Sequence, residues 1–275
     1  MKLLTVNMCM HVGPLQERLE ALGKLVQSKR PEFIALQGVS NEIMRKINGT
    51  MWGTRYNLSH PPTKYETRTK PTVAILSTYP PQQTLSITYV NTITNKVLLR
   101  GDFVMYDKQK QPHVISVCST LLEEGGDKSE VREIQINEAF LSLKDDEDCF
   151  VLGDFSLVND IDGDLHLSGG WHDSWVTNGK GSGETVVPTM NPLLKGEVPS
   201  GRPDRIFYKS MRYKLESVEV VGKEPISGAG IHISPHFGVF ASFTPLEQLN
   251  PPADLTEVPC FFNRKQWSLN FQQQK

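Results

Sequence analysis

The sequence lacks a dominant charge and any long apolar segment, and both absences narrow what the chain can be. It carries 29 Lys and Arg against 31 Asp and Glu, a net charge of −2. The chain therefore lacks the excess of positive charge that is typical of nucleic-acid-binding proteins, but this does not exclude a local basic groove. No stretch approaches the ~18 apolar residues of a membrane span. Residues 1–10, interrupted by Asn7, are too short for a secretory signal. We expect no membrane partner.

Cysteine is scarce and shows no pairing pattern. The four cysteines, Cys9, Cys118, Cys149 and Cys260, are not spaced like a disulfide framework or a metal site. Three of the four lie in apolar, strand-like runs. This is typical of reduced, buried thiols and predicts a cytoplasmic or nuclear protein. With 38% hydrophobic and 22% charged residues over 275 positions, the chain can bury a sizeable core in one large domain or two small ones.

Apolar periodicity predicts alternating strands and helices in the first part of the chain. Residues 2–8 and 33–36 read as strands, and residues 15–26 follow helical spacing up to Pro31. Ser40 or Asn41 can cap a short helix that ends at Gly49. After residue 52 the helical spacing gives way to short runs rich in Thr, Val and Tyr, which predict strands at 72–76, 83–90 and 96–105.

The second part of the chain continues this alternation. We expect a strand at 113–118 and then a helix over 129–143, capped by Ser129, with four side chains towards the core: Val131, Ile134, Phe140 and Leu141. Further strands are expected at 150–153, 205–208, 213–221 and 237–243. Residues 160–201, rich in Gly, Ser, Pro and Asn, predict a long loop that is functional or mobile. The pattern favours α/β or α+β layers, and two face-to-face sheets with helices outside would use every element.

Polar residues recur where apolar strands end. Asp154 directly follows the apolar run 150–153, where it either caps a turn or faces solvent at a reactive strand end. Asn7, Gln37, Asp204 and His236 occupy similar places. His236 suits acid–base work or phosphate contact, Asp204 could favour its imidazolium form, and Asp154 could take a proton from an attacking water. Each residue taken singly also has a structural explanation.

Four motifs strengthen the functional interpretation because they occur in a fixed order: Leu36-Gln37-Gly38-Val39, Gly153-Asp154-Phe155-Ser156, Arg202-Pro203-Asp204-Arg205-Ile206 and Ser234-Pro235-His236-Phe237-Gly238. The series resembles the endonuclease/exonuclease/phosphatase family, also called deoxyribonuclease I-like, and within it the tyrosyl-DNA phosphodiesterase branch. Arg132 and Gln135 also match an arginine and a glutamine of that family. The resemblance covers residues 2–243, so we expect one such domain over 1–246 and a C-terminal tail over 247–275.

The resemblance implies a four-layered sandwich, in which two mostly antiparallel sheets carry helices on both outer faces. It also implies magnesium-dependent cleavage of phosphodiesters, with DNA or RNA ends as ligands. In that family the acid matching Asp154 activates the water, and the histidine matching His236, held by the acid matching Asp204, stabilises the phosphate. The asparagine matching Asn7 orients these groups. Ser156 stands where the third motif has asparagine, and three further positions are expected to contact substrate: Arg202, Thr120 and Asn191.

Three acids that hold or surround the metal in the family are replaced here. Cys9, Gly38 and Pro235 occupy those positions. Magnesium prefers oxygen ligands and usually one or two carboxylates, which glycine and proline side chains cannot offer and which a soft thiol replaces poorly. A catalytic metal supplies several kcal/mol of transition-state stabilisation. We therefore expect no assured cofactor and a catalytically impaired protein.

Several functions remain open from the sequence. The first is a binding pseudoenzyme that holds nucleic-acid ends, a phosphorylated ligand or a protein partner around His236, Asp204 and Arg202. The second is an active magnesium-dependent phosphodiesterase with a metal site rebuilt around Asp154, Asp204 and His236, helped by Asp173 or Glu184. A scaffold with a relict pocket, a metal-free route through His236 and Asp154, and Cys9 as a nucleophile are further alternatives. A basic loop, formed by Lys64, Arg68 and Lys70, is either solvated or in contact with substrate.

Overall fold

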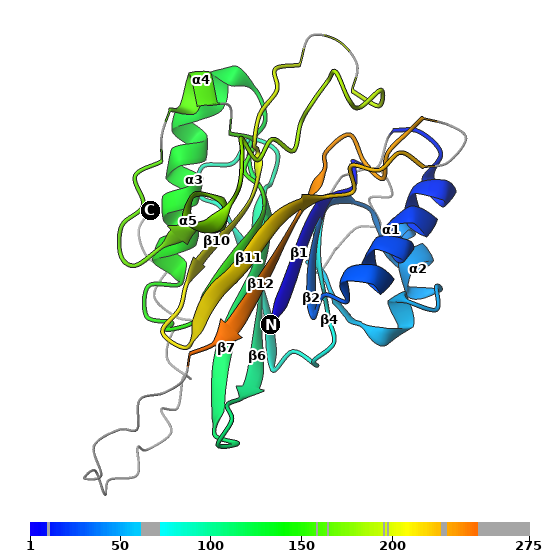
Figure 1. Cartoon of the computed structure of the whole chain (residues 1–275). Helices are drawn as coiled ribbons and strands as arrows, with labels where there is room; N and C mark the ends of the chain where they lie inside the picture. The colour runs from blue at the N-terminus through cyan, green and yellow to red at the C-terminus, as the bar shows by residue number, and fades with distance from the viewer. Residues whose placement is uncertain are drawn as a thin grey trace, which may run out of the picture.

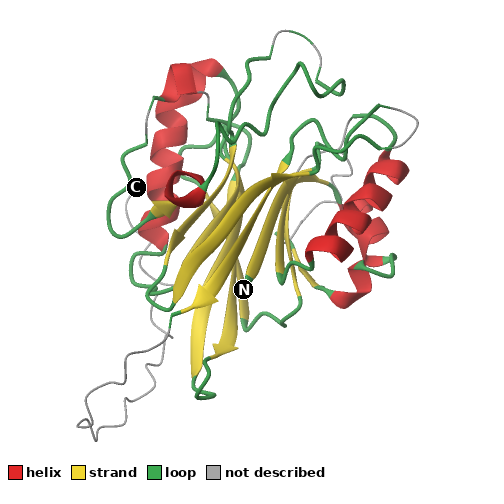
Figure 2. Ribbon diagram, viewed as in Figure 1, coloured by secondary structure: helices red, strands yellow, loops and turns green. Residues whose placement is uncertain are grey.

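The computed structural model describes residues 1–246 except 10–11, 62–71, 158, 164, 195, 197 and 227–229. Two six-stranded sheets pack face to face, and helices cover their outer faces (Figure 2). The first sheet has the order β11 (Tyr213–Val221), β12 (Gly238–Pro245), β1 (Lys2–Asn7), β2 (Phe33–Val39), β4 (Thr72–Ser77) and β3 (Asn57–Ser59). The second has the order β5 (Gln83–Thr88), β6 (Val97–Tyr106), β7 (Pro112–Leu121), β8 (Cys149–Asp154), β10 (Asp204–Lys209) and β9 (His172–Asp173). The predicted four-layered sandwich is confirmed.

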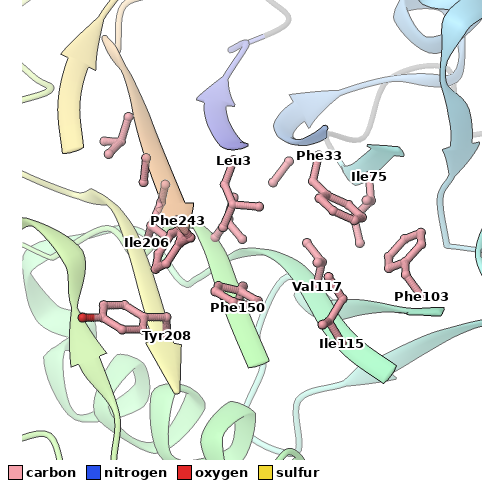
Figure 3. Packing of buried hydrophobic residues seen from close by; sticks show 14 of the residues in the cluster. Leu3, Phe33, Ile75, Phe103, Ile115, Val117, Phe150, Ile206, Tyr208 and Phe243 are labelled. Carbon is pink, nitrogen blue, oxygen red and sulfur yellow. The ribbon is translucent and has the colours of Figure 1, made fainter. Parts of the chain in front are cut away.

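The main core lies between the two sheets. Phe33 packs edge-to-face on Phe103, with ring centroids 4.8 Å apart, and Phe150 packs on Phe243 at 5.1 Å, so aromatic rings from both sheets interdigitate (Figure 3). Central strands such as β1, β2 and β8 are buried on both faces. This explains why their sequences are continuous apolar runs rather than alternating ones.

The first sheet is covered by α1 (Leu15–Lys29) and α2 (Asn41–Asn48), which lie side by side in Figure 1. Leu19, Leu22 and Val26 recur at helical spacing and are buried against this sheet. Ser40 caps α2 as expected, since its Oγ accepts a hydrogen bond from the Ile43 amide at 3.3 Å. Among the described residues, no helix is long and apolar enough to cross a membrane.

The second sheet is covered by α3 (Ser129–Ser142), whose buried face differs from the prediction. Ile134 and Leu141 are 41% and 66% exposed, Val131 and Phe140 are only half-buried, and Lys128 rather than Ser129 is the N-cap residue. The buried positions are Arg132, Gln135, Ile136 and Ala139. The predicted core face of this helix was therefore partly wrong.

Hydrogen bonding explains why α3 buries two polar residues. Arg132 forms a bidentate ion pair with Asp162 and donates to the carbonyl oxygens of Glu123 and Gly125. Gln135 accepts from the Glu123 amide and donates to the Asn91 carbonyl. Both side chains thus form hydrogen bonds with backbone groups of the turn after β7 that would otherwise lack partners. Apolar periodicity cannot predict such contacts.

Most of residues 160–201 form loop, as expected, with short elements inserted. These elements are α4 (Asn159–Asp162), β9 and α5 (Ser174–Asn178); single 3₁₀ turns, η1 (Gly53–Arg55) and η2 (Gly126–Lys128), occur elsewhere. Asp173 caps α5 by accepting from the Trp175 amide at 2.9 Å.

The strand pairing brings polar strand ends together at one end of the sandwich. The parallel pair β1–β2 places Asn7 opposite Gln37, and the antiparallel pair β8–β10 places Asp154 opposite Asp204. The last residues of β1 and β8 therefore meet the first residue of β10 across the two sheets.

Candidate functional site

Four side chains predicted from the motifs converge at this end of the sandwich. Asn7 donates from Nδ2 to Asp154 Oδ2 at 2.7 Å, which links the two sheets. His236, in the segment before β12, lies with Nδ1 2.9 Å from Asp204 Oδ2 and 3.7 Å from Asp154 Oδ2. Asn7, Asp154 and Asp204 are buried. The structure therefore builds one compact polar cluster from residues that lie more than 200 positions apart in sequence.

His236 is held as a cation by its neighbours. Burial alone would lower the pKa of its ring, but the charge and hydrogen bond of Asp204, with Asp154 nearby, raise the pKa to about 9. Nδ1 therefore donates to the Asp204 carboxylate at neutral pH, and Nε2 is the donor left for a ligand. The Thr185 hydroxyl also donates to Asp204 Oδ2, at 2.5 Å.

Both carboxylate oxygens of Asp154 accept hydrogen bonds from the protein. Its Oδ2 accepts from Asn7, and its Oδ1 accepts from the backbone amide of Ser156 at 2.7 Å and from its hydroxyl at 3.3 Å. Burial, and then the charge of Asp204, raise the pKa of Asp154. Ser156 has φ +51°, the left-handed conformation that turns its amide back onto the acid. Ser156 thus supports Asp154 directly.

A cavity of about 340 Å³ opens beside the cluster. Asp154, Ser156 and His236 line it together with Asn7 and Glu124. An apolar wall faces them, formed by Leu121, Leu157, Val186, Val198, Pro199 and Pro203. The cavity thus combines a few convergent polar groups with an apolar wall, which is typical of small-ligand sites.

Two of the expected metal-ligand positions, Cys9 and Gly38, also line this cavity. Gly38 has φ +60°, and a Cβ built there would lie 2.5 Å from Asn7 Oδ1 and 2.8 Å from the Cys9 amide nitrogen. Asn7 Oδ1 is itself fixed by a 2.9 Å hydrogen bond from that amide. Any side chain at position 38 therefore requires the backbone to move.

Pro235, the third expected position, lies in the described structure but not among the residues lining the cavity. Its carbonyl oxygen accepts a 2.9 Å hydrogen bond from Asn191. Burial raises the pKa of the Cys9 thiol, although nearby Arg18 opposes the shift. Cys9 is therefore a thiol rather than a thiolate at neutral pH, which does not suit a nucleophile or a metal ligand.

The donor set fits magnesium poorly. Single ligand atoms of Asp154, Asp204 and His236 lie within 4.8 Å of one another. However, His236 Nδ1 carries the proton that joins it to Asp204, and an imidazolium repels a cation. Asp204 Oδ1 is buried without a partner among the described residues, yet one free oxygen falls well short of a magnesium cage.

The three predicted substrate-contacting residues lie outside the cavity lining and bind the protein itself. Arg202 pairs with Asp173 at 2.9 Å, and the Thr120 hydroxyl contacts Tyr89 Oη at 2.8 Å. Asn191 is buried and donates to the carbonyls of Ser234 and Pro235. Substrate contact by these residues stays a prediction that the observed contacts do not favour. Lys64, Arg68 and Lys70 lie outside the described residues.

The two acids suggested as replacement ligands are also placed elsewhere. Asp173 is buried between Arg202 and Arg205, where a move into the cavity would break two ion pairs. Glu184 accepts from the Ser182 hydroxyl at 3.1 Å and is not among the lining residues. Neither position is ready to complete a metal site.

Sequence reasoning missed two residues that shape the site. Glu124 is exposed, lines the cavity and lies 3.3 Å from Lys96; a single acid in a loop gives no pattern to detect. Arg18 is fully buried on α1. It donates to the carbonyls of Met8, Val12 and Ile233 and so ties the chain after β1 to the segment before His236. Its place on the buried face of an amphipathic helix was the available signal.

This fold and this polar cluster define a class of protein. The model of the endonuclease/exonuclease/phosphatase family matches residues 4–236, and the chain belongs to that family. No curated protein sequence matches the chain.

Solved structures with the same fold include several of TDP2, tyrosyl-DNA phosphodiesterase 2. A humanized TDP2 of D. rerio gives a TM-score of 0.74 at 17% identity, over 89% of this chain and 98% of the other. A truncated TDP2 of Caenorhabditis elegans gives 0.74 at 18% identity, over 88% and 96%. D. rerio TDP2 in complex with a single-strand DNA product gives 0.74 at 18% identity, over 89% and 98%. The resemblance predicted from the motifs is thus confirmed as a likeness of fold.

Proposed function

We propose that this chain binds phosphate-bearing nucleic-acid ends through a metal-independent pocket and hydrolyses them little or not at all. One observation carries the proposal: the backbone at Gly38 is closed over Asn7 and Cys9, so a Cβ there would lie 2.5 Å from Asn7 Oδ1. The position that supplies a metal-site acid in the family is not merely substituted here. It is packed in a form that has no room for an acid.

The polar cluster supports phosphate binding without a metal. The imidazolium of His236 lines the cavity. Its Nδ1 donates a 2.9 Å hydrogen bond to Asp204 Oδ2, which fixes the orientation of the ring. A protonated histidine offers a charge-assisted hydrogen bond to a phosphate oxygen. The DNA product present in the D. rerio TDP2 complex suggests nucleic-acid ends as the ligand class, and a protein partner on the same pocket is compatible with this role.

The test compares ligand binding with and without a metal ion. A dye-labelled, 5′-phosphorylated single-stranded oligonucleotide is titrated with the full chain in EDTA and in Mg²⁺, with binding read by fluorescence anisotropy. We expect the two affinities to agree within about twofold and His236→Ala to weaken binding about tenfold or more, as for the loss of a charge-assisted hydrogen bond. His172→Ala, at an exposed histidine of β9, is the matched control and should bind like the wild type.

The main alternative is an active metal-dependent phosphodiesterase with magnesium held around Asp154, Asp204 and His236. The 4.8 Å grouping of their ligand atoms is the observation that favours it. This alternative predicts that the chain hydrolyses an activated thymidine phosphodiester in Mg²⁺ or Mn²⁺. It also predicts that Asp154→Ala and His236→Ala each abolish the hydrolysis. Such turnover, or binding that needs magnesium, would overturn the proposal. Failure of both binding and turnover would leave a relict pocket and would also overturn it.

A further inference from the structure

A second, larger cavity lies at the other end of the sandwich and plays no part in the proposed function. Its volume is about 590 Å³. It is lined by the end of β6, the start of β7 and β11, and the end of β12: Tyr106, Asp107, Lys108, Gln109, His113, Met211, Arg212, Tyr213, Pro245 and Leu246. These strand ends point to the lower side of Figure 1, whereas β1 runs upward to the candidate site.

The walls of this cavity combine aromatic, apolar and charged side chains, and three of the ten lining residues carry aromatic rings: Tyr106, His113 and Tyr213. His113 Nε2 lies 2.8 Å from Tyr213 Oη, and the two rings contact each other with centroids 5.8 Å apart. Tyr106 and Met211 are 68% and 73% exposed at the rim. Exposed aromatic and methionine side chains around a hollow are typical of surfaces that bind apolar or proline-rich peptides.

The chain itself leaves the described structure at this cavity. Leu246 donates from its amide to the Arg212 carbonyl at 2.7 Å, and both Pro245 and Leu246 line the hollow. Pro251 follows only five residues later, a span of at most ~18 Å when fully extended. A segment attached so close to a site has an effective concentration in the millimolar range.

The sequence that follows has the composition such a cavity would accept. Residues 251–262 read Pro-Pro-Ala-Asp-Leu-Thr-Glu-Val-Pro-Cys-Phe-Phe. The three prolines favour polyproline II geometry, and apolar and polar residues are mixed between them. Residues 247–259 contain three acids and no base. The cavity is lined by Lys108 and Arg212 against Asp107, although Arg212 already pairs with Glu147 and Asp148. Charge complementarity is therefore a minor contribution beside contact with the rings of Tyr106, His113 and Tyr213 and with the exposed side chain of Met211.

We propose that the proline-rich segment 251–262 of this same chain docks into the cavity formed by Tyr106, His113, Met211 and Tyr213. Aromatic-lined grooves bind polyproline II segments because the ligand is already extended and loses little entropy on binding. The short connection from Leu246 lowers the entropic cost further. The far end of the sandwich is thus a docking site for the C-terminal segment, independent of the phosphate pocket.

Hydrogen exchange of the full chain, read by mass spectrometry at short exchange times, tests this docking. We expect amides of residues 251–262 to exchange at least about tenfold more slowly than a free peptide, which corresponds to about 1.4 kcal/mol. Tyr106→Ser and Met211→Ser should each restore fast exchange there. Met51→Ser changes an apolar side chain that is 84% exposed elsewhere and should leave the protection intact.

Three outcomes would overturn the docking proposal. Exchange at free-peptide rates in the wild type means that the segment does not dock. Protection that survives both Tyr106→Ser and Met211→Ser means that it docks elsewhere. Protection that grows with protein concentration means that a second copy of the chain, rather than the same copy, fills the cavity.

Discussion

The backbone of Gly38 lies against the side chain of Asn7, so that a Cβ at position 38 would come within 2.5 Å of Asn7 Oδ1. Asn7 cannot retreat, because it is fixed both to Asp154 and to the Cys9 amide. A residue change at Gly38 therefore disturbs the link between the two sheets as well as the local backbone.

The first prediction concerns this position. We expect Gly38→Ala to lower the free energy of unfolding by about 1–3 kcal/mol, because a side chain is strained at φ +60° and also clashes. Gly38→Glu should lose a similar amount and gain no metal binding. Urea denaturation measures the loss. Gly49→Ala is the control, since the nearest atoms to a Cβ there lie 3.5 Å away. A stable Gly38→Glu variant that binds Mn²⁺ would refute our explanation of the missing acid.

The second prediction concerns the pH dependence of stability. Folding raises the pKa of His236 from 6.5 to about 9, so the folded protein holds the proton more tightly than the unfolded chain. The resulting stabilisation is fully present below about pH 6.5 and is lost as the pH rises through about 9. We expect the free energy of unfolding to fall by up to about 3 kcal/mol across this window, and urea denaturation at a series of pH values measures it.

The control for this prediction is His236→Asn, which lacks the titrating ring. Its stability should change less between pH 6.5 and 9 than that of the wild type, and the difference isolates His236 from other groups. NMR of the imidazole ring should give the raised pKa directly, and Asp204→Asn should bring it down. Parallel pH profiles for the wild type and His236→Asn would show that the ion pair with Asp204 does not stabilise the fold.

The third prediction concerns Arg18, which positions the site without lining its cavity. Arg18→Met removes the donors to two buried carbonyl oxygens, those of Met8 and Ile233, and to the part-buried carbonyl oxygens of Cys9 and Val12. We expect a loss of about 3 kcal/mol or more in the free energy of unfolding, since each unpaired buried acceptor costs about 1–3 kcal/mol. Arg45→Met, at an exposed position of α2, should stay within about 0.5 kcal/mol of the wild type. Equal stabilities in urea would contradict this role.

The layers and most elements could be predicted from the sequence, because the central strands are buried on both faces and read as apolar runs. The face of α3 could not. Arg132 and Gln135 are buried there to satisfy the turn after β7, while Ile134 and Leu141 are exposed. Apolar periodicity predicts which face of a helix packs against a hydrophobic core. It does not predict which polar side chains are buried to form hydrogen bonds with a neighbouring loop.

The site was predictable where it depends on strand ends and not where it depends on loops. Asn7, Asp154 and Asp204 lie at strand ends that strand pairing brings together, and His236 lies two residues before the start of β12. Arg202 and Asn191 stand in motif-like positions, yet their side chains bind Asp173 and the carbonyls beside His236. Whether a polar loop residue faces a ligand or its own backbone depends on tertiary contacts that spacing along the chain does not encode.

The most direct test of the missing cation site is a calorimetric titration of Mn²⁺ into the full chain and into its Asp154→Asn variant. Both oxygens of Asp154 accept hydrogen bonds from Asn7 and Ser156, and Asp204 Oδ2 accepts from His236. Asp204 Oδ1, which has no partner among the described residues, is too little for a cation site, so we expect neither protein to show saturable binding tighter than about 1 mM. Saturable Mn²⁺ binding in the micromolar range that disappears in Asp154→Asn would show that a metal site persists, and would contradict metal-independent phosphate binding.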